Sequence, residues 1–306
     1  MAAKAGKPAQ STPKVVDGSP SVLPMMLKAA LPVLPGVNLV PGLDRIGVAK
    51  RGGDLPDLAL VRHDVPLDPD HVSAYAAVCG FPRKDTLPVT YPHMLAFPLH
   101  LAIMTDGSFP FPAIGTLHLE NRLTQRRPIG LDERLQVTAR VENLRPHPKG
   151  RVFDFRTTVH SSGALVWESV STYLRRGDGD ADAPRGLELD VSPTGSVEWR
   201  LPGDLGRRYA AASGDHNPIH LHPLTAKAFG FPRQIAHGMW SKARCLAAVE
   251  NRLPDAVQVD VAFKKPILLP GTVRFGTERL EDGLAFTLTA KDGAPHLLGR
   301  ATKLTD

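Results

Sequence analysis

The chain has 306 residues and a formal net charge of +6, with 42% hydrophobic and 22% charged residues. These values are ordinary for a globular protein that contains two domains or one large one. Acidic and basic residues are interspersed, without a basic helix or a run of four basic residues, which argues against a nucleic-acid-binding protein.

The first 48 residues differ in composition from the rest of the chain. Residues 1–20 are polar and rich in Lys, Pro and Ser, so we expect a disordered, flexible tail there. Residues 21–43 are apolar but are interrupted by proline, and no continuous segment reaches the ~20 residues that a membrane span needs. The late apolar start and the lack of a clear cleavage site also argue against a signal peptide. We expect a short helix and an irregular apolar strap on the protein body.

An internal repeat fills the remainder of the chain. Residues 58–80 and 197–214 each predict a short strand, a turn with Pro and Asp, and a helix that ends in Tyr-Ala-Ala-x-x-Gly. An apolar segment long enough for a buried helix follows in each half, from Met94 to Met104 and from Met239 to Val249. The repeat predicts two similar units, at residues 49–176 and 196–306.

Antiparallel strands are predicted after each of these helices. Residues 117–137 and 259–275 both indicate a strand, a turn with basic residues and proline, and a second strand. Alternation of apolar and polar residues predicts the other strands at Gln136–Glu142, Arg151–His160, Ala164–Leu174, Val273–Leu280, Leu284–Lys291 and Leu297–Leu304. Residues 177–195 are polar and rich in Gly and Pro, as a linker is. The pattern predicts a duplicated α+β fold.

The most informative segment lies in the second unit. Asp215 and His220 are five positions apart on a turn rich in Gly, Asn and Pro, and Ala236-His237-Gly238-Met239 opens the following apolar helix. Polar groups on a tight turn beside an apolar helix suit a site that handles water next to an apolar substrate. The segment fills every named position of the pattern Y-x-x-x-S-G-D-x-N-P-I-H, with Tyr209, Ser213, Gly214, Asp215, Asn217, Pro218, Ile219 and His220. It therefore resembles the MaoC-like family of R-specific enoyl-thioester hydratases and dehydratases.

This resemblance implies a double hot-dog fold, in which two antiparallel sheets each wrap around a central helix and form a pseudo-dimer. It implies an (R)-specific 3-hydroxyacyl-thioester dehydratase, or trans-2-enoyl-thioester hydratase, of fatty-acid metabolism. The substrate would be an acyl-CoA or an acyl-carrier-protein thioester, and the reaction needs neither a cofactor nor a metal. A homodimer of the pseudo-dimeric chain is a further expectation.

The chemistry gives each motif residue an expected role. Asp215 is the base for the water, and His220 holds the same water and carries a proton. The N–H of Gly238, at the start of a helix, would hold the negative charge that develops on the thioester oxygen. The residues expected to support or bind are Asn217, Ser213, Pro218 and Tyr209. His222 lies outside the named motif positions, and we expect no catalytic role for it.

The first unit lacks the catalytic segment. The distance along the chain from Tyr75 to His93 is about ten residues shorter than that from Tyr209 to His237, and Met94 takes the place of Gly238. We therefore expect an inactive first half that leaves a tunnel for the acyl chain beside its central helix. The expected lining comes from residues 94–104 and from Phe81, Phe97, Phe109 and Phe111.

Several assignments stay open at the level of sequence. The cations expected near the carrier phosphates are Arg233, Lys242, Arg244, Lys264 and Lys265. A metal site built from Asp215, His220, His222 and His237 is an alternative that we do not favour, since this chemistry needs no metal. A non-catalytic acyl-thioester binder, a partner subunit of a larger dehydratase and a thioesterase are alternative functions. Cys79 and Cys245 lack metal-site spacing and suit the core of a protein in the reducing cytoplasm.

Overall fold

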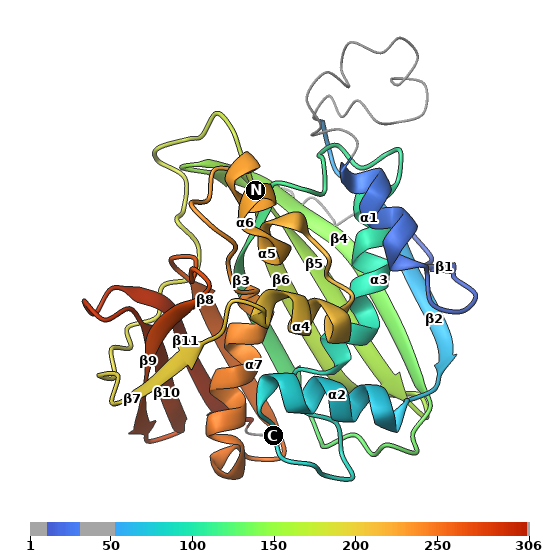
Figure 1. Cartoon of the computed structure of the whole chain (residues 1–306). Coiled ribbons are helices and arrows are strands. Elements are labelled where there is room, and N and C mark those ends of the chain that lie inside the picture. The colour runs from blue at the N-terminus through green and yellow to red at the C-terminus, as the bar shows by residue number, and fades with distance from the viewer. Residues whose placement is uncertain (1–10, 31–52, 305–306) are drawn as a thin grey trace, which may run out of the picture.

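A computed structural model describes residues 11–30 and 53–304 of the chain (Figure 1). The predicted tail up to residue 10 and the predicted strap at residues 31–48 lie outside the described residues. The first half holds β1 (Lys14–Val15), α1 (Val22–Ala30), β2 (Ala59–Val65), α2 (Pro69–Cys79), α3 (Pro92–Thr105), β3 (Thr116–Gln125), β4 (Leu135–His147), β5 (Gly150–Ser161) and β6 (Ala164–Arg176). The second half holds β7 (Val197–Leu201), α4 (Leu205–Ser213), α5 (Pro218–Leu221), α6 (Pro223–Ala228), α7 (Gly238–Ala248), the short 3₁₀ helix Glu250–Arg252, β8 (Val257–Phe263), β9 (Gly271–Leu280), β10 (Gly283–Thr289) and β11 (Pro295–Lys303).

Within the described residues the strands form one eleven-stranded sheet, in the order β1-β2-β4-β5-β6-β3-β8-β11-β10-β9-β7. The two halves meet where β3 pairs with β8 in antiparallel register, with Asn121 opposite Val261. The predicted duplication is confirmed, but the two expected sheets are continuous across this joint. Backbone hydrogen bonds at the joint leave no open sheet edge between the halves.

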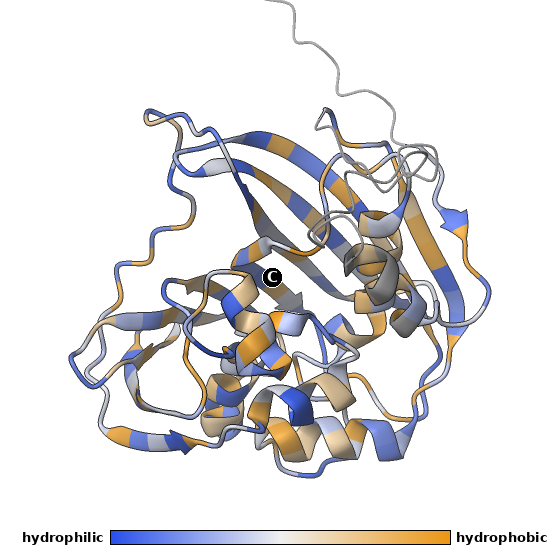
Figure 2. Ribbon diagram, turned by 45° about the horizontal axis from the view of Figure 1, so that its top comes forward, coloured by the Kyte–Doolittle hydropathy of each residue, from blue (hydrophilic) through white to orange (hydrophobic). Residues whose placement is uncertain are grey.

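One central helix packs on the sheet in each half, as the double hot-dog expectation requires. Helix α3 contacts β2, β4 and β5, and α7 contacts β10 and β11. The long strands alternate hydrophilic and hydrophobic residues along their length, as Figure 2 shows. This period of two turns one face of each strand toward the helix and the other toward solvent.

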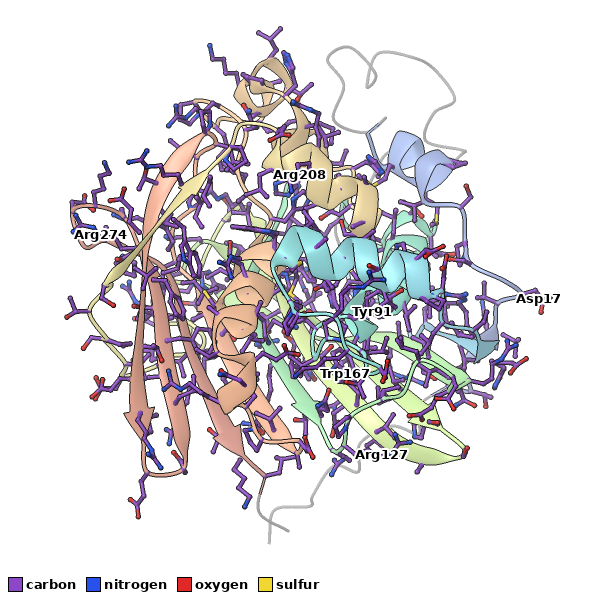
Figure 3. The ribbon with its side chains drawn as sticks, turned by 60° about the horizontal axis from the view of Figure 1, so that its bottom comes forward. Asp17, Tyr91, Arg127, Trp167, Arg208 and Arg274 are labelled. Carbon is purple, nitrogen blue, oxygen red and sulfur yellow. The ribbon has the colours of Figure 1, made fainter. Side chains whose placement is uncertain are left out.

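The core continues under α2. Tyr91 and Trp167 are almost fully buried, and the Trp167 indole N–H donates to the Val89 carbonyl at 2.8 Å. Both lie near the centre of the molecule in Figure 3, whereas the labelled residues Asp17, Arg127 and Arg274 lie near its edge. Of the described helices, none is both long and apolar enough to cross a membrane.

The N-terminal segment is more ordered than the composition suggests. Lys14 and Val15 pair in parallel with Leu60 and Val61 of β2, and the backbone N–H of Ser11 donates to Asp57 at 2.9 Å. The expected disorder is therefore wrong for residues 11–16, because hydrogen bonds to Asp57 and pairing with β2 hold them on the sheet edge. The predicted short helix is α1, which packs on α3.

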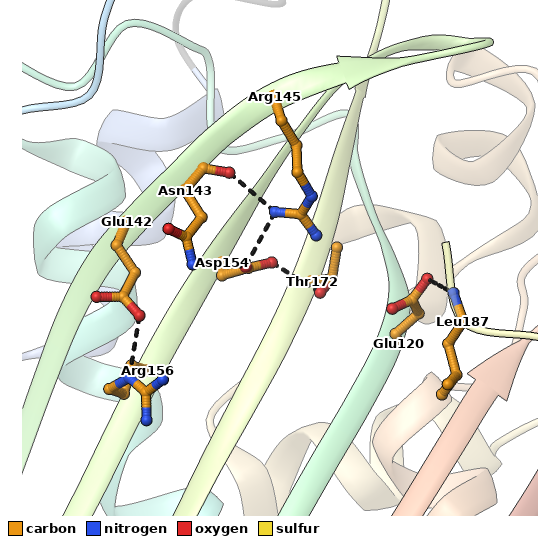
Figure 4. Close-up of polar contacts among 8 residues, drawn as sticks. All are labelled: Glu120, Glu142, Asn143, Arg145, Asp154, Arg156, Thr172 and Leu187. Atoms are coloured by element: carbon orange, nitrogen blue, oxygen red, sulfur yellow. Dashed lines mark hydrogen bonds and ion pairs between the residues drawn. The ribbon is translucent and has the colours of Figure 1, made fainter. Parts of the chain in front are cut away.

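The linker between the halves is anchored to β3. The Glu120 carboxylate accepts a hydrogen bond from the Leu187 backbone N–H at 2.6 Å (Figure 4). Gly186 has a φ of 97°, which strains other residues, and a Cβ there would lie 1.9 Å from the Glu120 carboxylate and displace it. In the same view, Arg145 of β4 forms an ion pair with Asp154 of the adjacent strand β5. The anchor brings the linker to the edge of the central pocket, where Leu187 is a lining residue.

Candidate active site

The motif forms a tight turn after α4. Helix α4 ends at Gly214, whose φ of 74° is a left-handed conformation that glycine adopts without strain. The Asp215 N–H then donates to the Ser213 hydroxyl at 3.2 Å, and the Asn217 N–H donates to the Asp215 carboxylate at 3.1 Å. These local bonds fix the turn and leave the other carboxylate oxygen of Asp215 outside it.

A single-turn helix, α5, then orients His220. The Asn217 side chain accepts from the Ile219 N–H at 3.3 Å, and Pro218 occupies the first helical position. Helix α4 packs closely here: a Cβ on Gly206 would lie 2.0 Å from the His220 carbonyl oxygen. Gly206 is a contributor that the motif does not reveal, because its requirement comes from a neighbouring helix.

His220 stacks face to face on His237, with ring centroids 3.7 Å apart. Nδ1 of His220 lies 2.8 Å from the Ile235 carbonyl oxygen, and Nε2 of His237 lies 3.0 Å from the Asp215 carbonyl oxygen. A carbonyl only accepts, so each of these nitrogens carries the proton. Nε2 of His220 is then left as a free acceptor.

Burial keeps both imidazoles neutral. It lowers the pKa of His220 from its ordinary value, while the Asp215 carboxylate and the bond to Ile235 act in the opposite direction. Burial, followed by the adjacent His220, holds the pKa of His237 well below its ordinary value. The Asp215 side chain keeps 28% of its surface exposed, 3.9 Å from His237. An anionic carboxylate beside a neutral imidazole with a free lone pair can hold and deprotonate a water molecule.

Gly238 opens α7 beside this pair. Its backbone N–H makes no hydrogen bond within the described residues, as expected in the first turn of a helix. A Cβ at this position would meet the Phe263 ring at 3.3 Å, closer than most such contacts. The glycine therefore leaves a free donor at a helix N-terminus, inside the same pocket as Asp215 and His220.

The pocket has a volume of about 390 Å³ and extends from these residues into the first half of the chain. It follows α3, where Phe97, Leu101 and Met104 line it, and Met26 of α1 covers it. The expected lining is thus present along α3, and its use as an acyl-chain tunnel stays a prediction. The expected lining is wrong for three phenylalanines that pack elsewhere: Phe81 stacks on Tyr75, and Phe109 and Phe111 pack against Phe153.

The predicted cations separate into two groups. Lys264 and Lys265 line the pocket, whereas Arg233 is exposed and is not among the lining residues. Arg244 lies over the Trp199 ring at 4.3 Å, also away from the lining. The structure adds lining cations that the sequence interpretation missed, because they come from the first half and the linker: Lys149, Arg176 and Arg185.

Lys242 is fully buried, which contradicts its expected role at a phosphate. Its ammonium group donates to the side chain and the backbone carbonyl of Asn121, at 2.5 and 3.1 Å, and to the Val259 carbonyl at 3.2 Å. Burial holds its pKa well below the ordinary value. Lys242 therefore ties α7 to β3 and β8 at the joint of the two halves.

The histidine-rich cluster partly resembles a metal site. One ligand atom from each of Asp215, His220 and His237 lies within 4.8 Å of the others. The two imidazoles are stacked, however, and each donates one ring N–H to a backbone carbonyl, which leaves a single lone pair on each ring. His222 is not part of the cluster; it is exposed and caps α6 by accepting from the Leu224 N–H at 3.2 Å. The arrangement suits proton transfer better than metal binding.

Comparisons with known proteins identify the family of the chain. Residues 189–293 match the family model of the MaoC like domain. The chain is 40% identical over 283 residues to 3-hydroxyacyl-thioester dehydratase X of Mycobacterium tuberculosis, covering 91% of this chain and 96% of that protein.

Solved structures give the same result. The crystal structure of HtdX from Mycobacterium tuberculosis superposes with a TM-score of 0.73 at 39% identity, covering 80% of this chain and all of that one. A second Mycobacterium tuberculosis protein, whose structure has a double hot-dog fold, gives a TM-score of 0.51 at 15% identity, over 85% of this chain and 99% of that one. The latter supports the fold alone.

Proposed function

The chain belongs to the MaoC-like dehydratase family, and on this basis we propose that it is a hydro-lyase that interconverts (R)-3-hydroxyacyl and trans-2-enoyl thioesters in fatty-acid metabolism. The observation that carries the proposal is the meeting of three groups in one pocket. They are the Asp215 carboxylate, the free Nε2 of His220 and the unpaired N–H of Gly238. Together they supply a base, a proton carrier and an oxyanion donor.

In the direction of hydration, a water molecule lies between Asp215 and Nε2 of His220. Asp215 accepts its proton as the water oxygen bonds to C3 of the enoyl thioester, and the electron pair of the double bond moves toward the thioester carbonyl. The Gly238 N–H and the α7 dipole stabilise the resulting oxyanion. The proton released by water then passes through the same pair to C2. Both additions occur on one face, so the reaction is syn, and dehydration is the reverse.

The supporting residues act through the turn. Ser213 and Asn217 hold Asp215 and the start of α5 by the bonds described above, and Pro218 sets the backbone of that helix. The Tyr209 ring lies 4.8 Å from that of His237 and backs the stacked pair. We assign these residues to positioning the reacting groups.

The carrier of the thioester, CoA or an acyl carrier protein, would lie at the cationic part of the pocket. Lys264 and Lys265 remain candidates for its phosphates, and Lys149, Arg176 and Arg185 join them. We omit Lys242 from this role because it is buried, and Arg233 and Arg244 because they lie outside the lining. A homodimer and a cytoplasmic location complete the proposal.

One assay tests the reaction. Crotonyl-CoA and longer trans-2-enoyl-CoA substrates are followed for loss of enoyl absorbance, while free thiol is measured in parallel. Stereospecific hydration without thiol release supports the proposal. Thiol release would instead indicate a thioesterase, and tight binding without turnover would indicate a non-catalytic acyl-thioester binder or a partner subunit.

A further inference from the structure

Three polar residues of the first half face the same pocket and have no role in the reaction described above. His93 is the second residue of α3, and His118 of β3 and Tyr173 of β6 lie opposite each other on paired strands. All three line the pocket. The His118 ring stacks on Tyr173 with centroids 4.4 Å apart, and His93 lies 6.3 Å from His118. We call these three residues the polar cluster.

The polar cluster has unused hydrogen-bonding capacity. Nδ1 of His93 and Nε2 of His118 are buried and have no partner within the described residues, and the Tyr173 ring, which lines the same pocket, adds a hydroxyl group. Buried polar atoms are rarely left without partners, because a group that loses its hydration without gaining a hydrogen bond destabilises the folded protein. Unpaired atoms on a pocket wall therefore point to a ligand that supplies the partner.

The polar cluster is uncharged. Burial lowers the pKa of His93 to about 4, with Lys242 lowering it further and Asp215 raising it. Burial also holds the pKa of His118 well below its ordinary value and raises the pKa of Tyr173. Near pH 7 each ring offers a donor and an acceptor without charge. This set matches a neutral hydroxyl or carbonyl oxygen and does not match a phosphate or a carboxylate.

The surroundings indicate which part of the substrate carries that oxygen. His93, Phe97, Leu101 and Met104 follow the helical period, so they lie on one face of α3, and all line the pocket. Phe263, which contacts the Gly238 position, also lies 5.1 Å from the His118 ring. The polar cluster thus lies between the proposed oxyanion donor and the apolar wall of α3, where an acyl chain would run.

We propose that His93, His118 and Tyr173 form a binding subsite for a hydroxyl or oxo oxygen on the acyl chain, so that the preferred substrates are oxygen-bearing acyl thioesters. The inference rests on the proposed function, since it assigns a substrate class to that same pocket. A plain alkyl chain displaces water from the cluster and leaves its polar atoms without hydrogen bonds. An oxygen at the right carbon of the chain forms those hydrogen bonds.

The test compares chain-matched substrates. A plain trans-2-enoyl-CoA of about ten carbons is compared with versions that carry one hydroxyl, moved a carbon at a time beyond C3. We expect one position to raise kcat/KM by roughly ten- to a hundredfold over the plain chain. Equal kcat/KM for the plain chain and every hydroxylated chain would overturn the subsite. No hydration of any substrate, the plain chain included, would instead overturn the proposed function.

Two substitutions locate the effect. Tyr173→Phe removes one oxygen and keeps the ring stacked on His118, and His118→Phe keeps an aromatic ring between Tyr173 and Phe263. Each should lower the preference for the hydroxylated chain at least severalfold and raise kcat/KM for the plain chain. Tyr75→Phe is the matched control: its hydroxyl bonds to Thr90 at 2.8 Å outside the pocket, so the preference should stay unchanged.

The variants also separate the subsite from other roles. Should His118→Phe fail to fold, Tyr173→Phe decides the question alone. A preference that survives Tyr173→Phe and His118→Phe overturns the assignment of these residues. An equal loss on plain and hydroxylated chains in both variants also overturns it, because that result indicates a role at the reacting atoms or in folding.

Discussion

The two halves of the chain share one architecture and differ in how they use it. In the second half, α7 has 11 residues and begins with Gly238, and α6 separates it from the turn that carries Asp215 and His220. In the first half, α3 has 14 residues, is almost entirely buried, and begins without such a turn. The first half also has the longer strands, with 13 residues in β4 against 7 in β10. The first half has no counterpart of the catalytic segment, and the pocket extends beside α3.

The comparison shows that the repeat without the catalytic motif still supplies part of the wall of the shared pocket. The pocket includes the proposed catalytic groups of one half and the helix face, cations and polar cluster of the other. The shared pocket exists because β3 and β8 pair at the joint, which brings the two halves of the sheet edge to edge. We therefore assign the chemistry to the second half and substrate selection to the first.

The largest effect should come from the catalytic pair. Asp215→Asn and His220→Ala should each lower kcat by roughly 10²–10⁴-fold, because each removes a positioned acid–base group while the fold persists. Hydration of an enoyl-CoA, together with circular dichroism to verify folding, measures this. His222→Ala, which alters an exposed histidine of the same segment, should stay within a few-fold. Near wild-type turnover in Asp215→Asn would remove the basis for assigning the chemistry to this half.

The next effect compares the two helix starts. Gly238→Val should lower kcat by about 10²-fold or more, because the added side chain meets Phe263 and shields the N–H from the thioester oxygen. Met94→Val, at the corresponding position of the first half, should alter KM for long chains and leave kcat within a few-fold. An active and folded Gly238→Val enzyme would contradict the oxyanion role, and an equal loss of kcat in both variants would contradict the division between the halves.

A smaller effect should follow chain length. Each methylene buried along α3 stabilises binding by up to about 0.8 kcal/mol, so kcat/KM should rise by up to about fourfold per carbon and then level off. Leu101→Trp fills the pocket and should shorten this rise, lowering kcat/KM for long chains by roughly tenfold while crotonyl-CoA changes little. A titration over acyl lengths provides the measurement. A flat profile, or a strict preference for four carbons, would reject the acyl-chain tunnel in the first half.

The smallest effect per residue concerns acid stability. Buried His93 has a pKa of about 4 in the folded protein, against an ordinary value of 6.5. The unfolded chain therefore binds more protons between these values, and the free energy of unfolding falls as pH decreases through this range. Each such histidine contributes a slope of up to about 1.4 kcal/mol per pH unit.

Urea unfolding between pH 7 and pH 4 measures this slope. His93→Gln should lower this slope by the amount that corresponds to one proton, about 1.4 kcal/mol per pH unit. Burial also lowers the pKa values of His118 and His100, so each should contribute to the slope in the same direction. A free energy of unfolding that does not change between pH 6 and pH 5 would contradict the burial of neutral histidines in the first half.

The sequence alone determined the parts of this protein that depend on near neighbours. The Gly214 turn, the Asn217 cap and the spacing of Asp215 and His220 rest on hydrogen bonds between residues a few positions apart. The helices α2, α3, α4 and α7 and the strands that follow the central helices also followed from local patterns, whereas β1, α5 and α6 did not, and the duplication followed from repeated patterns. Each is encoded within a short window, so a single sequence suffices to predict it.

Tertiary structure decided what depends on distant segments. The stacking of His237 on His220 and the tie from Lys242 to Asn121 join segments that no local pattern relates. Lys242 was misassigned because one residue type serves both surfaces and buried joints, and only packing distinguishes them. The polar cluster was missed for the same reason: His93, His118 and Tyr173 meet only when α3, β3 and β6 close around one pocket.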